Sequence, residues 1–185
     1  MKTKRKIRPA IYTIGHSNRS LREFVDLLAA HGIRQVIDVR TVPRSRHNPQ
    51  FNGKRLASSL KKHDLRYVRL ELLGGFRHVK KESKNTGWRN LSFRGYADYM
   101  GTEAFNEGLA MLESLGRKST SVIMCAEALP WRCHRSLIAD ALTKRRWDVR
   151  DIMSASNAPK HTLTPFLRMR RGVLTYPAPV ARAKS

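Results

Sequence analysis

Residues 121–135, SVIMCAEALPWRCHR, concentrate the residue types that could do chemistry. Both cysteines of the chain, one glutamate and one histidine lie within ten residues, from Cys125 to His134. Apolar or small residues precede Cys125, and a helical pattern begins at Cys133. The segment therefore predicts a buried strand, a turn with Pro130 and a helix. Open α/β sheets bind ligands at such carboxyl strand ends, so we predict a functional site here. The segment does not identify the reaction.

Cys125 and Glu127 are the first candidates for catalysis. The predicted strand end places Cys125 near the N-terminus of the next helix, where the helix dipole favours a thiolate nucleophile. Glu127 could act as a general acid or base. The alternatives are a buried Cys125 that serves as a small hydrophobic residue and a Glu127 that orients the turn. Six residues separate Cys125 from Arg132, so the C-x5-R loop of thiol phosphatases is not matched.

Metal binding is a second chemistry that these residue types allow. Zinc accepts cysteine and histidine ligands, which Cys125, Cys133, His134 and His16 could provide. The paired C-x2–4-C spacing of structural zinc sites is absent, however. Cys133 lies four residues before Leu137 on the predicted helix, which favours a side chain that faces the core. We therefore assign no metal ligands, and the sequence identifies no cofactor.

Polar residues or glycines also follow the other predicted strands. His16 follows the first strand, Asp38 and Arg40 end the second, and Gly74 follows the third. Parallel strands bring such ends to one edge of a sheet, so we expect His16 and Asp38 to assist Cys125 and Glu127 in catalysis. Asp38 and Arg40 could instead form an internal ion pair. We assign substrate binding to the polar residues and glycines nearby: Ser17, Arg40, Arg44, Ser45, Gly74, Gly75, Tyr96, His134 and Arg135.

The charge of the chain points to polyanions. It has 37 Lys and Arg against 14 Asp and Glu, for a net charge of +23, which favours contact with nucleic acid. The loop 76–94 mixes basic and aromatic residues, as a surface that stacks bases and binds phosphates does. We assign nucleic-acid binding there to Trp88, Arg89, Lys80 and Lys81. The alternatives are a solvated charged surface and a loop whose aromatic rings pack on the body of the protein.

The elements that must position these residues alternate along the chain. The pattern predicts strands at 10–14, 35–39, 66–72, 121–124 and 149–153, and helices at 20–32, 55–63, 95–116 and 133–146. This alternation predicts an α/β fold with a mostly parallel open sheet and helices on both faces. A partial barrel is the second choice. We expect a basic disordered arm at 1–9, one domain at 10–154 and a weakly structured extension at 155–185.

Composition also bears on location. No apolar run approaches the length of a membrane span, and no apolar segment of a signal peptide follows the basic N-terminus. Two cysteines are not a disulfide framework. We therefore expect a cytoplasmic protein without a membrane partner, and the sequence leaves the oligomeric state unknown.

Several motifs together resemble the domain-of-unknown-function 488 family of bacteria and archaea. They are TIGHS (13–17), DVRTVPRS (38–45), LGG (73–75), GYADYM (95–100) and CAEALPWRCHR (125–135), in an order that covers roughly residues 11–153. The resemblance implies an α/β fold and a site but no reaction. The site residues that it implies are His16, Ser17, Asp38, Arg40, Pro43, Ser45, Gly74, Gly75, Tyr96, Cys125, Glu127, Pro130, Cys133, His134 and Arg135.

Three functions follow from these observations. The first is an enzyme that acts on a phosphate-bearing substrate, a nucleic acid or a nucleotide, at a pocket of Cys, Glu, Asp and His residues. The second is a non-catalytic nucleic-acid-binding module. The third is a thiol- or metal-dependent enzyme that acts on a small molecule, in which case the positive charge is incidental.

Overall fold

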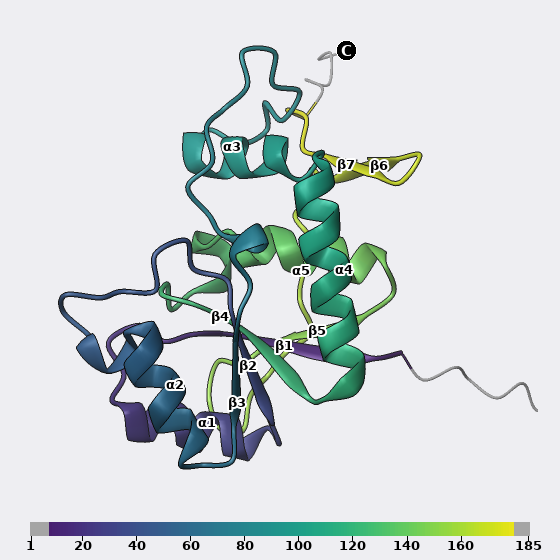
Figure 1. Cartoon of the computed structure of the whole chain (residues 1–185). Helices are drawn as coiled ribbons and strands as arrows, with labels where there is room; N and C mark the ends of the chain where they lie inside the picture. Colours follow the sequence, from purple (N-terminus) through teal and green to yellow (C-terminus); the bar gives the residue numbers. More distant parts are fainter. Residues whose placement is uncertain (1–7, 180–185) are drawn as a thin grey trace, which may run out of the picture.

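Five parallel strands form an open sheet at the centre of the molecule. The structure is a computed structural model that describes residues 8–179. Its strands are β1 (Ala10–Gly15), β2 (Gln35–Asp38), β3 (Arg66–Arg69), β4 (Ser121–Cys125) and β5 (Asp148–Asp151). They lie in the order β3-β2-β4-β1-β5 (Figure 1). The open parallel sheet predicted from the alternating pattern is confirmed, and the partial barrel is not found.

Helices cover both faces of the sheet. One apolar cluster joins α1 (Leu21–Ala30) and α2 (Gly53–Lys61) to one face, and a second joins α3 (Leu91–Tyr99), α4 (Glu103–Lys118) and α5 (Arg135–Lys144) to the other (Figure 1). Side chains alternate along β4, so Val122 and Met124 belong to the first cluster and Ile123 and Cys125 to the second. Cys125 therefore lies on the face that α5 covers.

The sequence correctly predicts the start of α1, but it does not predict the break between α3 and α4. The local sequence Ser20-Leu21-Arg22-Glu23 has the pattern of a capping box, and the side chains of Ser20 and Glu23 form it. The single helix predicted at 95–116 is wrong, because Gly101 separates α3 from α4 and Thr102 caps the second helix. The Thr102 hydroxyl accepts the backbone N–H of Phe105 at 3.3 Å, although no acid completes a capping box.

The third strand is shorter than the sequence predicts. Asp38, the last residue of β2, pairs with Arg69, so no neighbour remains to extend β3 towards residue 72. The chain instead forms a short 3-10 helix at Glu71–Leu73 (η2). Two further 3-10 helices, Pro49–Phe51 (η1) and Pro130–Arg132 (η3), follow β2 and β4.

The chain beyond Ser154 packs on the body of the protein. Leu167 and Tyr176 are buried in the cluster around α5, where the sequence pattern predicts little structure. Strands β6 (Arg168–Arg170) and β7 (Val173–Thr175) form an antiparallel hairpin, which turns at Gly172 with a φ of +80°. Most of the predicted basic arm, residues 1–7, and the end of the extension, residues 180–185, lie outside the described residues.

Candidate active site at the carboxyl end of the sheet

Most of the predicted catalytic and substrate-binding residues meet in a crevice at the end of β4. This strand lies between β1 and β2. The helix that follows β4, α5, covers one face of the sheet, whereas α1 and α2, which follow β1 and β2, cover the other. Such a change of direction opens a crevice at the carboxyl ends of the strands. The crevice holds a pocket of about 540 Å³, lined from the three strand ends by His16, Arg40 and Cys125. The predicted convergence of His16, Asp38 and Cys125 at one edge is confirmed by the register.

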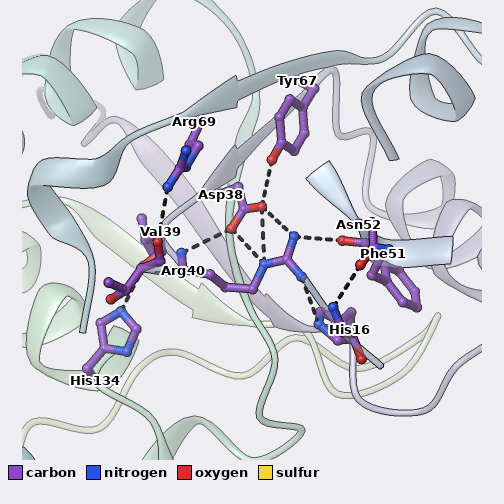
Figure 2. A network of polar contacts seen from close by, with 11 residues as sticks. His16, Asp38, Val39, Arg40, Phe51, Asn52, Tyr67, Arg69 and His134 are labelled. Atoms are coloured by element: carbon purple, nitrogen blue, oxygen red, sulfur yellow. Dashed lines mark hydrogen bonds and ion pairs between the residues drawn. The ribbon is translucent and has the colours of Figure 1, made fainter. Parts of the chain in front are cut away.

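Arg40 lies at the centre of a buried polar network (Figure 2). Its Nη2 donates to Oδ2 of Asp38 at 2.6 Å, and its Nε donates to Oδ1 at 2.9 Å. The Tyr67 hydroxyl donates to the same carboxylate at 2.7 Å, and burial raises the pKa of Tyr67, which keeps this proton in place. Asp38 is fully buried and outside the pocket lining. It therefore forms the internal ion pair rather than a substrate clamp.

His16 fixes the other side of the guanidinium. Burial lowers the pKa of His16 to about 4, so the ring is neutral at pH 7. Its Nδ1 donates to the carbonyl of Ser17 at 2.8 Å, and its Nε2 accepts from Nη1 of Arg40 at 3.2 Å. The ring stacks on Phe51 at 4.3 Å. Both ring nitrogens are occupied, so the structure places His16 and Asp38 where they orient Arg40.

Arg40 itself keeps one donor for a ligand. A guanidinium has five N–H groups. Nε and Nη2 are used by Asp38 and the Phe51 carbonyl, and one N–H of Nη1 is used by His16. The second Nη1 hydrogen has no partner among the described residues, and Arg40 lines the pocket. It can therefore bind an anionic oxygen at the pocket floor.

Cys125, Cys133 and His134 form a cluster on the pocket wall. Nδ1 of His134 lies 3.9 Å from the sulfur of Cys125 and 3.7 Å from that of Cys133. The neighbouring Cys133 side chain, followed by burial, raises the pKa of Cys125. The Cys125 side chain lowers the pKa of Cys133 against the effect of burial, with a further contribution from His134.

Cys133 lies nearer to the start of α5 than Cys125, the residue at which a thiolate was predicted. Cys133 stands two residues before Arg135, the first residue of α5, and its sulfur lies 3.5 Å from the backbone nitrogen of Arg135. Cys125 is the last residue of β4. Cys133 also packs in the core cluster, as its spacing to Leu137 predicts.

The imidazole of His134 is held from three sides. Its Nε2 lies 3.0 Å from the carbonyl oxygen of Val39, which can only accept, so Nε2 carries the proton (Figure 2). The ring centroid of Tyr96 lies 4.9 Å from that of His134, and the Tyr96 hydroxyl donates to the Leu73 carbonyl. A Cβ atom on Gly75 would stand 3.0 Å from Nδ1, so this glycine permits the close approach of the ring to the backbone.

The other predicted binding residues divide into lining and supporting groups. Glu127 and Arg44 are exposed and line the pocket. Arg135 is buried outside the lining, where its guanidinium donates to the carbonyls of Glu127 and Ala128 and fixes the turn after β4. Of the predicted substrate-binding residues, Arg40, Arg44, Ser45, Gly75, Tyr96 and His134 line the pocket, whereas Ser17, Gly74 and Arg135 are not part of its lining.

The loop 76–90 is ordered by a buried acid that sequence reasoning overlooked. The carboxylate of Asp98 accepts from the backbone of Lys80 at 2.9 Å and from side chains of Ser83 and Asn85 at 2.7 Å each. The basic residues Lys80, Lys81 and Arg89 are exposed.

Trp88 in this loop is half-buried and packs against other aromatic rings. Its ring stacks on Phe93 at 4.7 Å and meets the edge of Phe166 at 5.0 Å. Tyr176 lies 5.8 Å away. This arrangement matches the alternative in which the loop packs its aromatic rings on the body of the protein.

Phe76 and Arg132 are pocket residues that were not assigned from the sequence. The Phe76 side chain is 81% exposed although it is aromatic. Its φ of 50° lies in the left-handed region, which is strained for a bulky residue. Arg132 is exposed at the same pocket. The one signal in the sequence is an aromatic residue directly after two glycines and before a basic run.

A second polar cluster lies away from this pocket. His161 donates through Nε2 to Asp140 at 3.0 Å and through Nδ1 to Asp151 at 3.1 Å. Burial would lower the pKa of His161, but the two carboxylates raise it to about 9. Tyr176 and Thr13 donate to the same acids. His161 and Asp151 line a separate pocket of about 630 Å³.

Comparison with known proteins identifies the family. A family model described as "Domain of unknown function DUF488" matches residues 20–142. The chain belongs to this family. No curated protein and no solved structure matches the chain. The matched segment of this family member spans α1 to α5 and contains every strand end of the pocket except that of β1.

Within residues 8–179, no helix combines the length and the apolar character that crossing a bilayer requires.

Proposed function

We propose that the protein is an enzyme that acts on a phosphate-bearing substrate, a nucleotide or a nucleic-acid strand, in the pocket at the end of β4. The observation that carries the proposal is the placement of Phe76 at a pocket lined by Arg40, Arg44 and Arg132. An exposed aromatic ring beside cations suits a base and its phosphate. Backbone strain such as that at Phe76 is characteristic of functional sites.

The residues of the pocket suggest how the work is divided. Arg40 binds a phosphate oxygen with its remaining Nη1 hydrogen, and Arg44 and Arg132 add positive charge at the mouth. Cys125, Cys133 and His134 supply the reactive group on the opposing wall, and Glu127 transfers protons. Asp38 and His16, which the sequence suggested as catalytic, position Arg40. The net charge of +23 supports a polyanionic partner.

Binding tests the substrate class. We expect Phe76→Ala to weaken binding of a fluorescent single-stranded oligonucleotide by about 5- to 150-fold, which corresponds to about 1–3 kcal/mol. Trp131→Ala is the matched control, because Trp131 is 61% exposed and lines the other pocket. Arg44→Gln should make the slope of log K against log salt shallower by about 0.7, and the exposed Lys62→Gln should not. Equal binding by wild type and Phe76→Ala would overturn the substrate class.

Turnover tests whether the pocket is catalytic. We expect the protein to convert the bound oligonucleotide or a mononucleotide to products that chromatography separates. Cys133→Ser should abolish this conversion while oligonucleotide binding remains. Binding without any conversion by the wild type would contradict the enzyme and favour the non-catalytic binding module.

A further inference from the structure

Three side chains on the pocket wall have the geometry of metal ligands. The sulfurs of Cys125 and Cys133 and the Nδ1 of His134 all lie within 4.8 Å of one another. In a tetrahedral zinc site the usual Zn–S and Zn–N bond lengths place sulfur and nitrogen ligands about 3.6 Å apart. Nδ1 lies 3.9 Å and 3.7 Å from the two sulfurs. The cluster needs only a small contraction to surround an ion.

We propose that Cys125, Cys133 and His134 form a metal centre that binds Zn²⁺ through two sulfurs and one imidazole nitrogen. Thiolate and imidazole ligands select soft and borderline metals over Mg²⁺ or Ca²⁺. From the sequence we assigned no metal ligands, because the usual paired cysteine spacing is absent. The fold replaces that spacing, since Cys125 ends β4 and Cys133 with His134 precedes α5.

The orientation of His134 supports the proposal independently. A ligating histidine usually donates its other ring N–H to a carbonyl or carboxylate, which fixes the ring. Nε2 of His134 donates to Val39 in this way, at 3.0 Å. In the neutral ring the lone pair on Nδ1 then faces the two sulfurs. Gly75 and Tyr96 pack against the ring and hold it there.

The centre would have one open coordination position. Among residues 8–179, the ligand group consists of these three side chains, and all three line the pocket. Structural zinc sites use four protein ligands, whereas catalytic sites use three and leave one position for water or substrate. This inference deepens the proposed function, because a zinc ion here could polarise a phosphate oxygen or activate a water molecule. The binding of zinc itself does not depend on that function.

Binding of the ion has a defined proton balance. Each cysteine that ligates Zn²⁺ loses its S–H proton to solvent, and each sulfur forms one bond to the metal. His134 binds as the neutral imidazole and keeps the proton on Nε2. Two thiolates then neutralise the two positive charges of the ion.

Cobalt titration tests the centre directly. Reduced, metal-free protein without an affinity tag is titrated with Co²⁺, and we expect one ion per chain with thiolate charge-transfer and tetrahedral d–d absorption bands. Competition with a chromophoric chelator then gives the affinity for Zn²⁺. Cys125→Ser, Cys133→Ser and His134→Gln should each weaken Zn²⁺ binding by about 100-fold or more. His63→Gln, an exposed histidine, is the matched control and should bind as the wild type does.

The outcomes separate this inference from the proposed function. Circular dichroism shows which variants are folded, and the wild-type titration needs no variant at all. Absence of a thiolate–cobalt band in the reduced wild type, or its survival in the folded Cys133→Ser variant, would overturn the metal centre. If oligonucleotide binding persists in that case, the proposed substrate class stands. If the metal binds but Phe76→Ala leaves oligonucleotide binding unchanged, only the substrate class fails.

Discussion

Nη2 of Arg40 lies 2.6 Å from Oδ2 of Asp38, and the side chains are 5% and 0% exposed. The Asp38 carboxylate accepts hydrogen bonds from Arg40 and Tyr67. It has a structural role, because breaking these contacts would leave a buried charge without a partner. The consequence for function is that Arg40 meets its ligand in one fixed orientation. Such preorganised charge is what a site for an anionic substrate requires.

The first prediction concerns this ion pair. Asp38→Asn should lower the free energy of unfolding by about 3–5 kcal/mol, because Arg40 loses its buried counter-charge. Asp26→Asn is the control, since Asp26 pairs with Arg22 on the surface and should change stability by less than about 0.5 kcal/mol. Urea denaturation measures both. Similar stabilities for the two variants would contradict a buried ion pair.

The second prediction concerns the glycine beside His134. Gly75→Ala should weaken Zn²⁺ binding by about tenfold, because its Cβ would press on Nδ1 at 3.0 Å and turn the ring from the sulfurs. Gly101→Ala is the control, since its Cβ would meet an ordinary contact at 3.7 Å. Chelator competition measures the affinity of each variant. An unchanged affinity in Gly75→Ala would show that the position of the ring does not matter for metal binding.

The third prediction is a pH dependence of stability. The pKa of His161 is about 9 in the folded protein and 6.5 without its partners. Because the folded state binds this proton more tightly, the stabilisation is fully present below about pH 6.5 and is lost as the pH rises through 9. The loss amounts to roughly 3 kcal/mol. Urea unfolding at several pH values should show this decline in the wild type and in the exposed control His63→Gln, but not in His161→Gln. A parallel decline in His161→Gln would assign it to other groups.

The fourth prediction separates packing from base stacking at Trp88. Trp88→Ala should lower the free energy of unfolding by about 2–4 kcal/mol, because the indole packs against Phe93 and Phe166. Binding of a single-stranded oligonucleotide should stay within about twofold of the wild type under conditions where the variant is folded. Thermal unfolding and fluorescence anisotropy measure the two effects. A stable variant with weak binding would restore Trp88 as a base-stacking residue.

The sequence by itself determined the order of the elements and the place of the site. Alternating strand and helix patterns require parallel pairing, and parallel strands bring their carboxyl ends to one edge. That reasoning brought His16, Arg40 and Cys125 together before any contact was known. The capping box at Ser20 is also local, since its two hydrogen bonds form within three residues. The sequence could therefore predict features set by the order of the elements and features set by near neighbours in the chain.

Only the tertiary structure decided what each site residue does. Asp38 is satisfied by Tyr67 from the next strand, and His134 is oriented by Val39, 95 residues away in the chain. The lowered pKa of Cys133 depends on the side chain of Cys125, and the packing of Trp88 against Phe166 and Tyr176 depends on the C-terminal segment. Hydrogen-bond partners, burial and ligand distances arise from contacts between distant segments, and sequence spacing carries no information about those contacts until the chain has folded.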